Sequence, residues 1–176
     1  MNGRRRYDLV LAIYPNTRGF AFVVFEGPLA PVDWGVTEIR GKNKNKRCLR
    51  RIAVMFGQYE PDALVLQNMS EPDGGIHRAR RIRTLNDAIE VLAETQGIPA
   101  FAYSRAQVRQ CFGHLGPATK HSIAEAIAKH IPVFERFLPP VRKIWMSEDA
   151  RMGLFDAVAL ALTFFQAEGV PPPTRA

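Results

Sequence analysis

The sequence predicts an α/β fold in which a five-stranded mixed sheet carries helices on both faces. Three strand-like apolar segments follow one another near the start of the chain with short turns between them, which is typical of an antiparallel meander. Two further apolar segments each follow a helical pattern, as in parallel strands joined by helical crossovers. With 176 residues, 47% of them hydrophobic, the chain is most simply one domain over residues 1–170, and we expect the Pro-rich residues 171–176 to form a disordered tail.

The predicted strands are apolar runs that end at turn-forming residues. The first run is continuous and is followed by Tyr14-Pro15-Asn16, so it is expected to be a buried central strand. Gly27-Pro28 ends the second. The five strands are expected over residues 9–13, 19–25, 32–39, 63–67 and 99–103.

Helices are predicted between and after the last strands. In the longest of them Ile82, Leu85, Ile89 and Leu92 recur every three or four positions, and Gly97 suits its C-terminal cap. These helices are expected over residues 45–58, 76–96, 105–112 and 119–130. A segment with three prolines, residues 131–146, separates them from the final helix.

The final helix, within residues 147–165, is hydrophobic nearly all round. Such a helix lies inside its domain, yet it carries Asp156 near its middle. A buried carboxylate is costly unless it is paired, hydrogen-bonded or bound to a metal. Asp156 is therefore either a structural residue with an Arg or backbone partner, or part of a functional site.

Positive charge is concentrated in two blocks of a chain whose net charge is +7. Clustered cations favour a polyanionic partner, most often nucleic acid, although a merely soluble basic surface is the alternative. The second block falls in the first turns of a predicted helix, where cations oppose the helix dipole and an anionic partner would offset them. The blocks comprise Arg40, Lys42, Lys44, Lys46, Arg47, Arg50 and Arg51, and then Arg78, Arg80, Arg81 and Arg83.

Cys48 and Cys111 are isolated in the sequence, which predicts neither a zinc ribbon nor a disulfide framework and fits a reducing cytoplasm. The apolar run at residues 9–13 is too short for a signal peptide or a membrane span. We therefore expect a cytoplasmic protein without a membrane partner.

Three motifs, in order and on the expected elements, resemble those of RuvC-type Holliday junction resolvases in the ribonuclease H-like superfamily. They are residues 11–16 (LAIYPN), 64–67 (LVLQ) and 153–159 (GLFDAVA). In that family the first strand ends in an Asp, the fourth strand ends in a catalytic Glu, and the last helix carries two aspartates three positions apart. Here Tyr14, Gln67 and Gly153 replace three of these carboxylates, and Asp156 alone matches.

The resemblance implies a ribonuclease H-like fold, branched DNA as ligand and a homodimer, but the replacements bear on its metal chemistry. Two-metal phosphodiester hydrolysis needs carboxylates that hold two divalent ions about 3.5–4 Å apart. We expect Mg²⁺ or Mn²⁺ only if the protein is active, with Asp156 as first ligand. Weaker candidates are Asp149, roughly 10 Å away along the helix, and Glu71 and Asp73 in the loop after the fourth strand.

Two roles are predicted for the neighbours of Asp156. If the fold brings Tyr14 and Gln67 to Asp156, their hydroxyl and amide groups can both donate to its carboxylate without a metal. Lys120 resembles a basic residue at the family's site and could contact a phosphate. Trp145, like Trp34, is expected in the core or an interface.

Three functions follow from these observations. The first is a RuvC-like protein that binds branched or structured DNA through the two basic blocks, with its phosphodiesterase activity lost or impaired. The second is an active Mg²⁺- or Mn²⁺-dependent structure-selective endonuclease that uses displaced carboxylates. The third is a non-catalytic dimeric scaffold.

Overall fold

The computed structural model describes residues 7–70, 76–115 and 118–169. The predicted elements are present. Two short 3-10 helices, η1 and η2, occur in segments for which no helix or strand was predicted. The strands are β1 Val10–Pro15, β2 Gly19–Phe25, β3 Pro31–Glu38, β4 Ala63–Gln67 and β5 Ala100–Tyr103. The helices are α1 Lys44–Tyr59, α2 Ile76–Thr95, α3 Arg105–Cys111, η1 Gly113–Leu115, α4 Lys120–His130, η2 Pro132–Phe137 and α5 Met152–Ala167.

The five strands form one mixed sheet in the order β3-β2-β1-β4-β5. The first three strands pair antiparallel, whereas β1 pairs with β4 and β4 with β5 in parallel. The predicted α/β fold with its mixed sheet is thus confirmed. Because parallel neighbours end at the same edge, Tyr14 near the end of β1 and Gln67 at the end of β4 are brought to one edge of the sheet.

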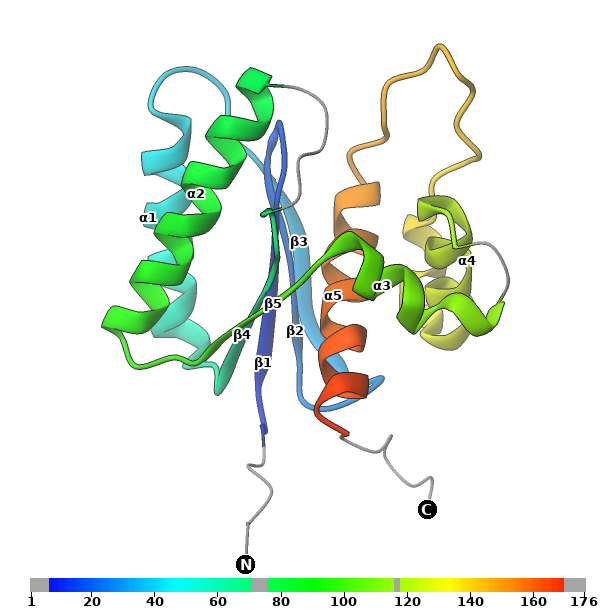
Figure 1. Cartoon of the computed structure of the whole chain (residues 1–176), viewed down its shortest axis with the longest axis horizontal. Helices are drawn as coiled ribbons and strands as arrows, with labels where there is room; N and C mark the ends of the chain where they lie inside the picture. The colour runs from blue at the N-terminus through cyan, green and yellow to red at the C-terminus, as the bar shows by residue number, and fades with distance from the viewer. Residues whose placement is uncertain (1–6, 71–75, 116–117, 170–176) are drawn as a thin grey trace, which may run out of the picture.

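Helices cover both faces of this sheet, with α1 and α2 on one side and α3, α4 and α5 on the other (Figure 1). Side chains alternate across β1: Leu11 and Ile13 belong to the core beneath α1 and α2, while Val10 and Ala12 belong to the core around α5. The same alternation puts Tyr14 on the α5 side, where its ring packs against that core.

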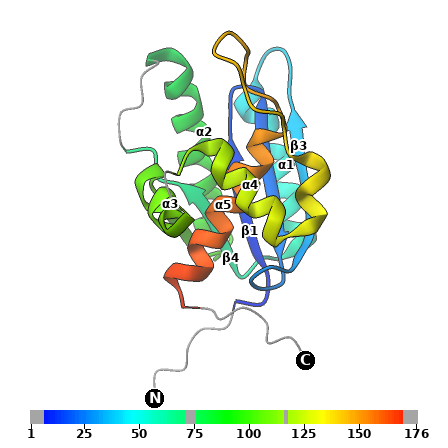
Figure 2. The ribbon, with the colours of Figure 1, turned by 90° about the vertical axis from the view of Figure 1, so that its right-hand side faces the viewer.

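Helix α5 is buried, as its composition predicted. Between Met152 and Phe165 every residue is buried except Asp156 and Leu162, which are partly exposed. The helix packs on the middle of the sheet while α3 and α4 cover it from outside (Figures 1 and 2). No helix in the described part of the chain is both long and apolar enough to cross a bilayer.

The segment before α5 differs from the prediction. Residues 132–137 form η2, whose Phe134 is fully buried and packs edge-on against Trp34 at a centroid distance of 5.2 Å. Beyond η2 the chain leaves the body of the fold as a long loop (Figure 2). In it Trp145 is 77% exposed, so of the two predicted positions, the core or an interface, the core is wrong for this residue. The predicted Pro-rich tail lies outside the described residues.

Candidate functional site

The three positions that correspond to the family's carboxylates on β1, β4 and α5 line one open pocket. Tyr14 and Gln67 come from the carboxyl ends of β1 and β4, and Asp156 from the second turn of α5. Lys120 lines the same pocket from the start of α4. The fold thus brings together residues that lie far apart in the sequence.

Lys120 is the ionic partner of Asp156. Its Nζ lies 3.3 Å from Oδ2 of Asp156 and 2.8 Å from Oε1 of Glu148. Thr119 and Ser122 form a reciprocal capping box that fixes the first turn of α4 and with it the origin of this side chain. An ammonium group therefore bridges a carboxylate that is 16% exposed and another that is 45% exposed.

The hypothesis named Tyr14 and Gln67 as the hydrogen-bond donors to the carboxylate of Asp156, and these donors are wrong. Among the described residues neither of them donates a hydrogen bond to its carboxylate, and Lys120 does so instead. A phenol and an amide stay neutral, whereas an ammonium also compensates the buried charge. Tyr14 contributes its ring, whose centroid lies 5.7 Å from Nζ of Lys120, as a cation–π contact.

Burial and the ion pairs shift the pKa values of these groups. Burial raises the pKa of Asp156 to about 6, although Lys120 opposes the shift; Glu148 adds to it. Burial alone would lower the pKa of Lys120, but the nearby charge of Asp156 and the groups of Tyr14 and Glu148 raise it above its ordinary value. The pKa of Tyr14 is raised by burial and by Asp156. At neutral pH the pair is therefore an ionised carboxylate and an ammonium.

The residues present do not fit the divalent metal that the resemblance implies. No group of three or more His, Cys, Asp or Glu side chains able to hold an ion occurs within residues 7–70, 76–115 and 118–169. Asp149 lies near the same end of α5 but is held by Arg151, whose Nε and terminal nitrogen donate to its two oxygens at 2.9 and 2.7 Å. The hydrogen bonds to Arg151 lower the pKa of Asp149 to about 2. The other weak candidates, Glu71 and Asp73, lie outside the described residues.

Gly153 gives a steric reason why a carboxylate does not fit at its position. A Cβ placed on Gly153 would lie 2.9 Å from Nδ2 of Asn16 and 3.3 Å from Cβ of Ala21. Asn16 is not free to move, because its Oδ1 accepts from the backbone N–H groups of Arg18 and Gly19, each at 3.0 Å. The space that an aspartate would need is occupied by the turn between β1 and β2.

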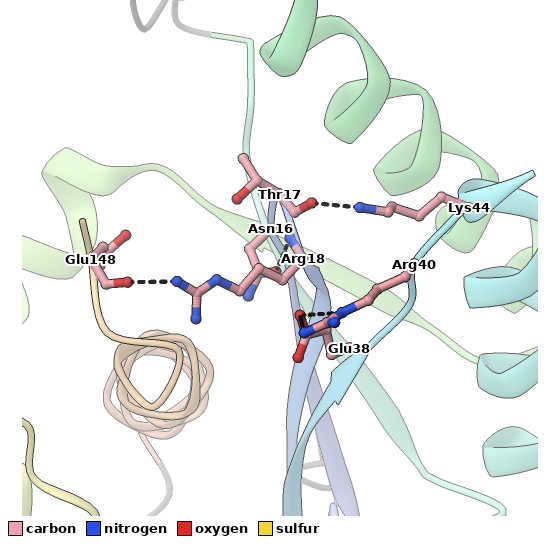
Figure 3. A network of polar contacts seen from close by, with 7 residues as sticks. All are labelled: Asn16, Thr17, Arg18, Glu38, Arg40, Lys44 and Glu148. Carbon is pink, nitrogen blue, oxygen red and sulfur yellow. Dashed lines mark hydrogen bonds and ion pairs between the residues drawn. The ribbon is translucent and has the colours of Figure 1, made fainter. Parts of the chain in front are cut away.

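That turn also connects the two sides of the molecule. Lys44 at the start of α1 donates to the carbonyl of Thr17 at 2.9 Å, and Arg81 of α2 donates to that of Asn16 at 2.9 Å. On the other side Arg18 donates to the carbonyl of Glu148 at 3.1 Å (Figure 3). The sequence marked this segment as a turn but held no signal for these long-range contacts.

The predicted nucleic-acid-binding cations fall into two groups. Four of them make contacts within the chain: Lys44 and Arg81 as just described, Arg47 with the carbonyl of Arg40 at 2.6 Å, and Arg40 itself with Glu38 at 3.1 Å (Figure 3 shows the last pair).

The second group is exposed and has no ion-pair or hydrogen-bond partner among the residues that the structure describes. Its members are Lys42, Lys46, Arg50, Arg51 and Arg80. Arg83 has interactions of its own. Arg78 lies in α2, and its side chain is outside the described part. Helices α1 and α2 both begin at the edge where β1 and β4 end, so the two basic blocks lie at the same edge as the Lys120 pocket (Figure 1).

Comparison with known proteins shows which solved structures share this fold. No protein-family model and no curated protein matches the sequence. Among solved structures, Thermus thermophilus RuvC in complex with a Holliday junction substrate is similar with a TM-score of 0.63 and 20% identity, covering 92% of this chain and 96% of that one. A second Thermus thermophilus RuvC structure gives 0.64 and 22%, covering 92% and 97%.

A fowlpox virus resolvase in complex with Holliday junction DNA is less similar, with a TM-score of 0.49 and 10% identity, covering 90% of this chain and 99% of that one. The similarity to the two RuvC structures extends over nearly the whole chain. It agrees with the strand order and with the helices on both faces of the sheet described above. The chain therefore has the ribonuclease H-like fold in the form seen in RuvC.

Proposed function

We propose that this protein binds branched or structured DNA through its basic edge and does not hydrolyse phosphodiester bonds. The observation that carries the proposal is the ammonium group of Lys120, paired with Asp156 and Glu148 in the pocket at the carboxyl ends of β1 and β4. The resemblance implies a basic residue at the family's site as well, so the difference lies in the carboxylates. Neutral Tyr14 and Gln67 replace two of them in this pocket, and the remaining one, Asp156, is paired with Lys120.

Electrostatics support both halves of the proposal. A divalent ion near Asp156 would be repelled by the fixed charge of Lys120, and displacing the lysine would leave its charge without these two partners. A DNA phosphate meets the opposite field, because the exposed cations of the α1 and α2 blocks lie at the same edge. One Thermus thermophilus RuvC structure of similar fold was solved in complex with a Holliday junction substrate, which supports a branched ligand here as well.

The proposed cations differ in what they can do. Lys46 and Arg50 are four positions apart in α1, so they lie on one helix face, and both are exposed. Lys44 and Arg81 already hold the β1–β2 turn. We assign phosphate contacts to the exposed group and a structural task to the paired group.

The test is a binding titration of a labelled four-way junction and a linear duplex of the same length at about 50 and 200 mM salt. Each titration is repeated with Mg²⁺ and with Mn²⁺, for the unaltered protein and for Asp156→Asn. We expect junction binding that weakens steeply with salt, no cleavage in either metal, and the same affinity for the variant. Asp149→Asn is the matched control, because it also removes one carboxylate charge near the start of α5.

Two outcomes would contradict the proposal. Absence of salt-dependent binding to either DNA would remove its first half. Metal-dependent cleavage that Asp156→Asn abolishes and Asp149→Asn retains would remove its second half, because Asp156 would then act as a metal ligand despite Lys120.

A further inference from the structure

The loop between η2 and α5 carries four large apolar side chains that are exposed to solvent. Val141 is 69% exposed, Ile144 96%, Trp145 77% and Met146 44%. Large apolar side chains gathered on one exposed segment mark an interaction site more often than scattered ones do. Nothing in the described part of the chain covers this segment, which leaves it open to another molecule.

The tip of this loop is a defined turn. The N–H of Met146 donates to the carbonyl of Lys143 at 3.0 Å, which makes Ile144 and Trp145 the two central residues. The two most exposed apolar side chains of the molecule's described part therefore stand next to each other at the tip.

Both ends of the loop are anchored. Pro139 is buried beside η2 at one end. At the other end Glu148 is held twice, since Arg18 donates to its carbonyl and Lys120 to its carboxylate. The tip is thus carried on a base that is bonded to the β1–β2 turn and to the Lys120 pocket.

The charges around the tip select the kind of partner. Arg142 and Lys143 precede it and are exposed, and residues 139–147 contain no acidic side chain. Nζ of Lys143 lies 5.3 Å from the ring centroid of Trp145, so cation and aromatic face form one unit. An anionic partner with flat apolar surfaces fits this combination, and nucleic-acid bases with their phosphates supply both.

The position of the loop agrees with that partner. It rises beside α4 and α5 from the edge of the sheet at which α1 and α2 begin, while α1 and α2 lie on the other face of the sheet (Figures 1 and 2). We propose that Trp145, supported by Ile144, stacks on an unpaired base of structured DNA while Arg142 and Lys143 contact the adjoining phosphates. This inference rests on the proposed function and names the element that would distinguish unpaired bases from a continuous duplex.

The test uses the fluorescence of Trp145, taken as the difference between the unaltered protein and Trp145→Phe, which retains Trp34. The ligands are a duplex with a two-base bulge, the fully paired duplex and vesicles of phosphatidylcholine with phosphatidylglycerol. We expect strong quenching by the bulged duplex and weak quenching by the paired one. Trp145→Ala should bind the bulged duplex about 5- to 150-fold more weakly, as loss of one stacked base predicts. Its affinity for the paired duplex should change little. Trp145→Phe, which keeps an aromatic ring, should bind both duplexes nearly as the unaltered protein does.

The control variant is Val91→Ala, which shortens an apolar side chain that is 61% exposed in the C-terminal half of α2. It should leave all affinities unchanged. If Trp145→Ala binds the bulged duplex as tightly as the unaltered protein does, the inference is wrong while the proposed DNA binding stands. Quenching by the vesicles without quenching by DNA would also overturn it, in favour of a lipid surface. If the unaltered protein binds the four-way junction but not the bulged duplex, the inference is likewise wrong, and only if it binds neither of the duplexes nor the junction does the proposed function itself fail.

Discussion

Replacing Asp156 by Asn should stabilise the protein at neutral pH. The pKa of Asp156 is raised from 3.8 to about 6, mainly by burial. Between these values the folded protein holds a proton that the unfolded chain has released, so the free energy of unfolding falls as pH rises through this interval. A difference of about two pKa units corresponds to about 3 kcal/mol at pH 7. An Asn carries no charge and avoids this loss.

We therefore expect Asp156→Asn to match the unaltered protein near pH 4 and to exceed its unfolding free energy by up to about 3 kcal/mol at pH 7. Lys120 keeps Glu148 as its partner in the variant, which limits the counter-effect. Urea unfolding at a series of pH values, followed by fluorescence and fitted to a two-state transition, measures the difference directly.

Asp149→Asn provides a control of opposite sign. Hydrogen bonds to Arg151 lower the pKa of Asp149 to about 2, so it contributes stability that is present above its ordinary pKa and lost as the pH falls toward 2. Its Asn variant should be less stable than the unaltered protein at pH 7. The reasoning about Asp156 is refuted if Asp156→Asn is also destabilised at pH 7, because the ion pair with Lys120 would then outweigh the cost of burial.

Three further predictions concern the same edge. Lys120→Met should lower the unfolding free energy by about 1–3 kcal/mol at pH 8, because it leaves Asp156 without its ionic partner. This is less than the loss of a fully buried pair would cost, since Lys120 is 36% exposed. At pH 5 the decrease should be smaller, because Asp156 can take up a proton. Gly153→Ala should destabilise by about 1–3 kcal/mol in urea unfolding, although alanine is the better helix former, because its Cβ would lie 2.9 Å from Nδ2 of Asn16. Lys46→Ala combined with Arg50→Ala should reduce the slope of log affinity against log salt for DNA by about 1.8, without a change in stability.

The last two of these predictions have matched controls. Gly57→Ala lies in the exposed part of α1 with no atom within 4 Å of the new Cβ, so it should stabilise by about 0.4–1 kcal/mol. Lys129→Ala removes an exposed cation near the end of α4 and should leave the salt slope as it is. A gain of stability in Gly153→Ala, or a slope that Lys46 and Arg50 do not affect, would count against the assigned contacts.

The sheet could be predicted because its signals are local. The run at β1 is apolar on both faces since helices cover both sides of a central strand, and it ends at Pro15 and Asn16, where the structure has its turn. The burial of helix α5 could be predicted as well, because a helix that is apolar all round has to be buried. The same reasoning predicted that Asp156, a carboxylate in such a helix, needs a partner.

The partner of Asp156 could not be derived in this way. Lys120 lies 36 positions earlier, and its reach to Asp156 depends on how α4 packs beside α5, which no local pattern encodes. Several cations of the basic blocks look alike in the sequence, yet Lys44 and Arg81 are used to hold a turn while Lys46 is exposed. Trp145 was expected in the core or an interface, and its exposure becomes visible only with the loop in place.

The contact between Gly153 and Asn16 limits how this sequence can change. An aspartate at position 153 requires that the side chain at position 16 give way, but Asn16 organises the turn to which Lys44, Arg81 and Arg18 are connected. A single substitution toward the acidic pattern of the resolvases therefore disturbs the fold before it adds a ligand. An aspartate at position 153 therefore calls for a second change at position 16, and that change alone would remove the two hydrogen bonds that Asn16 makes in the turn.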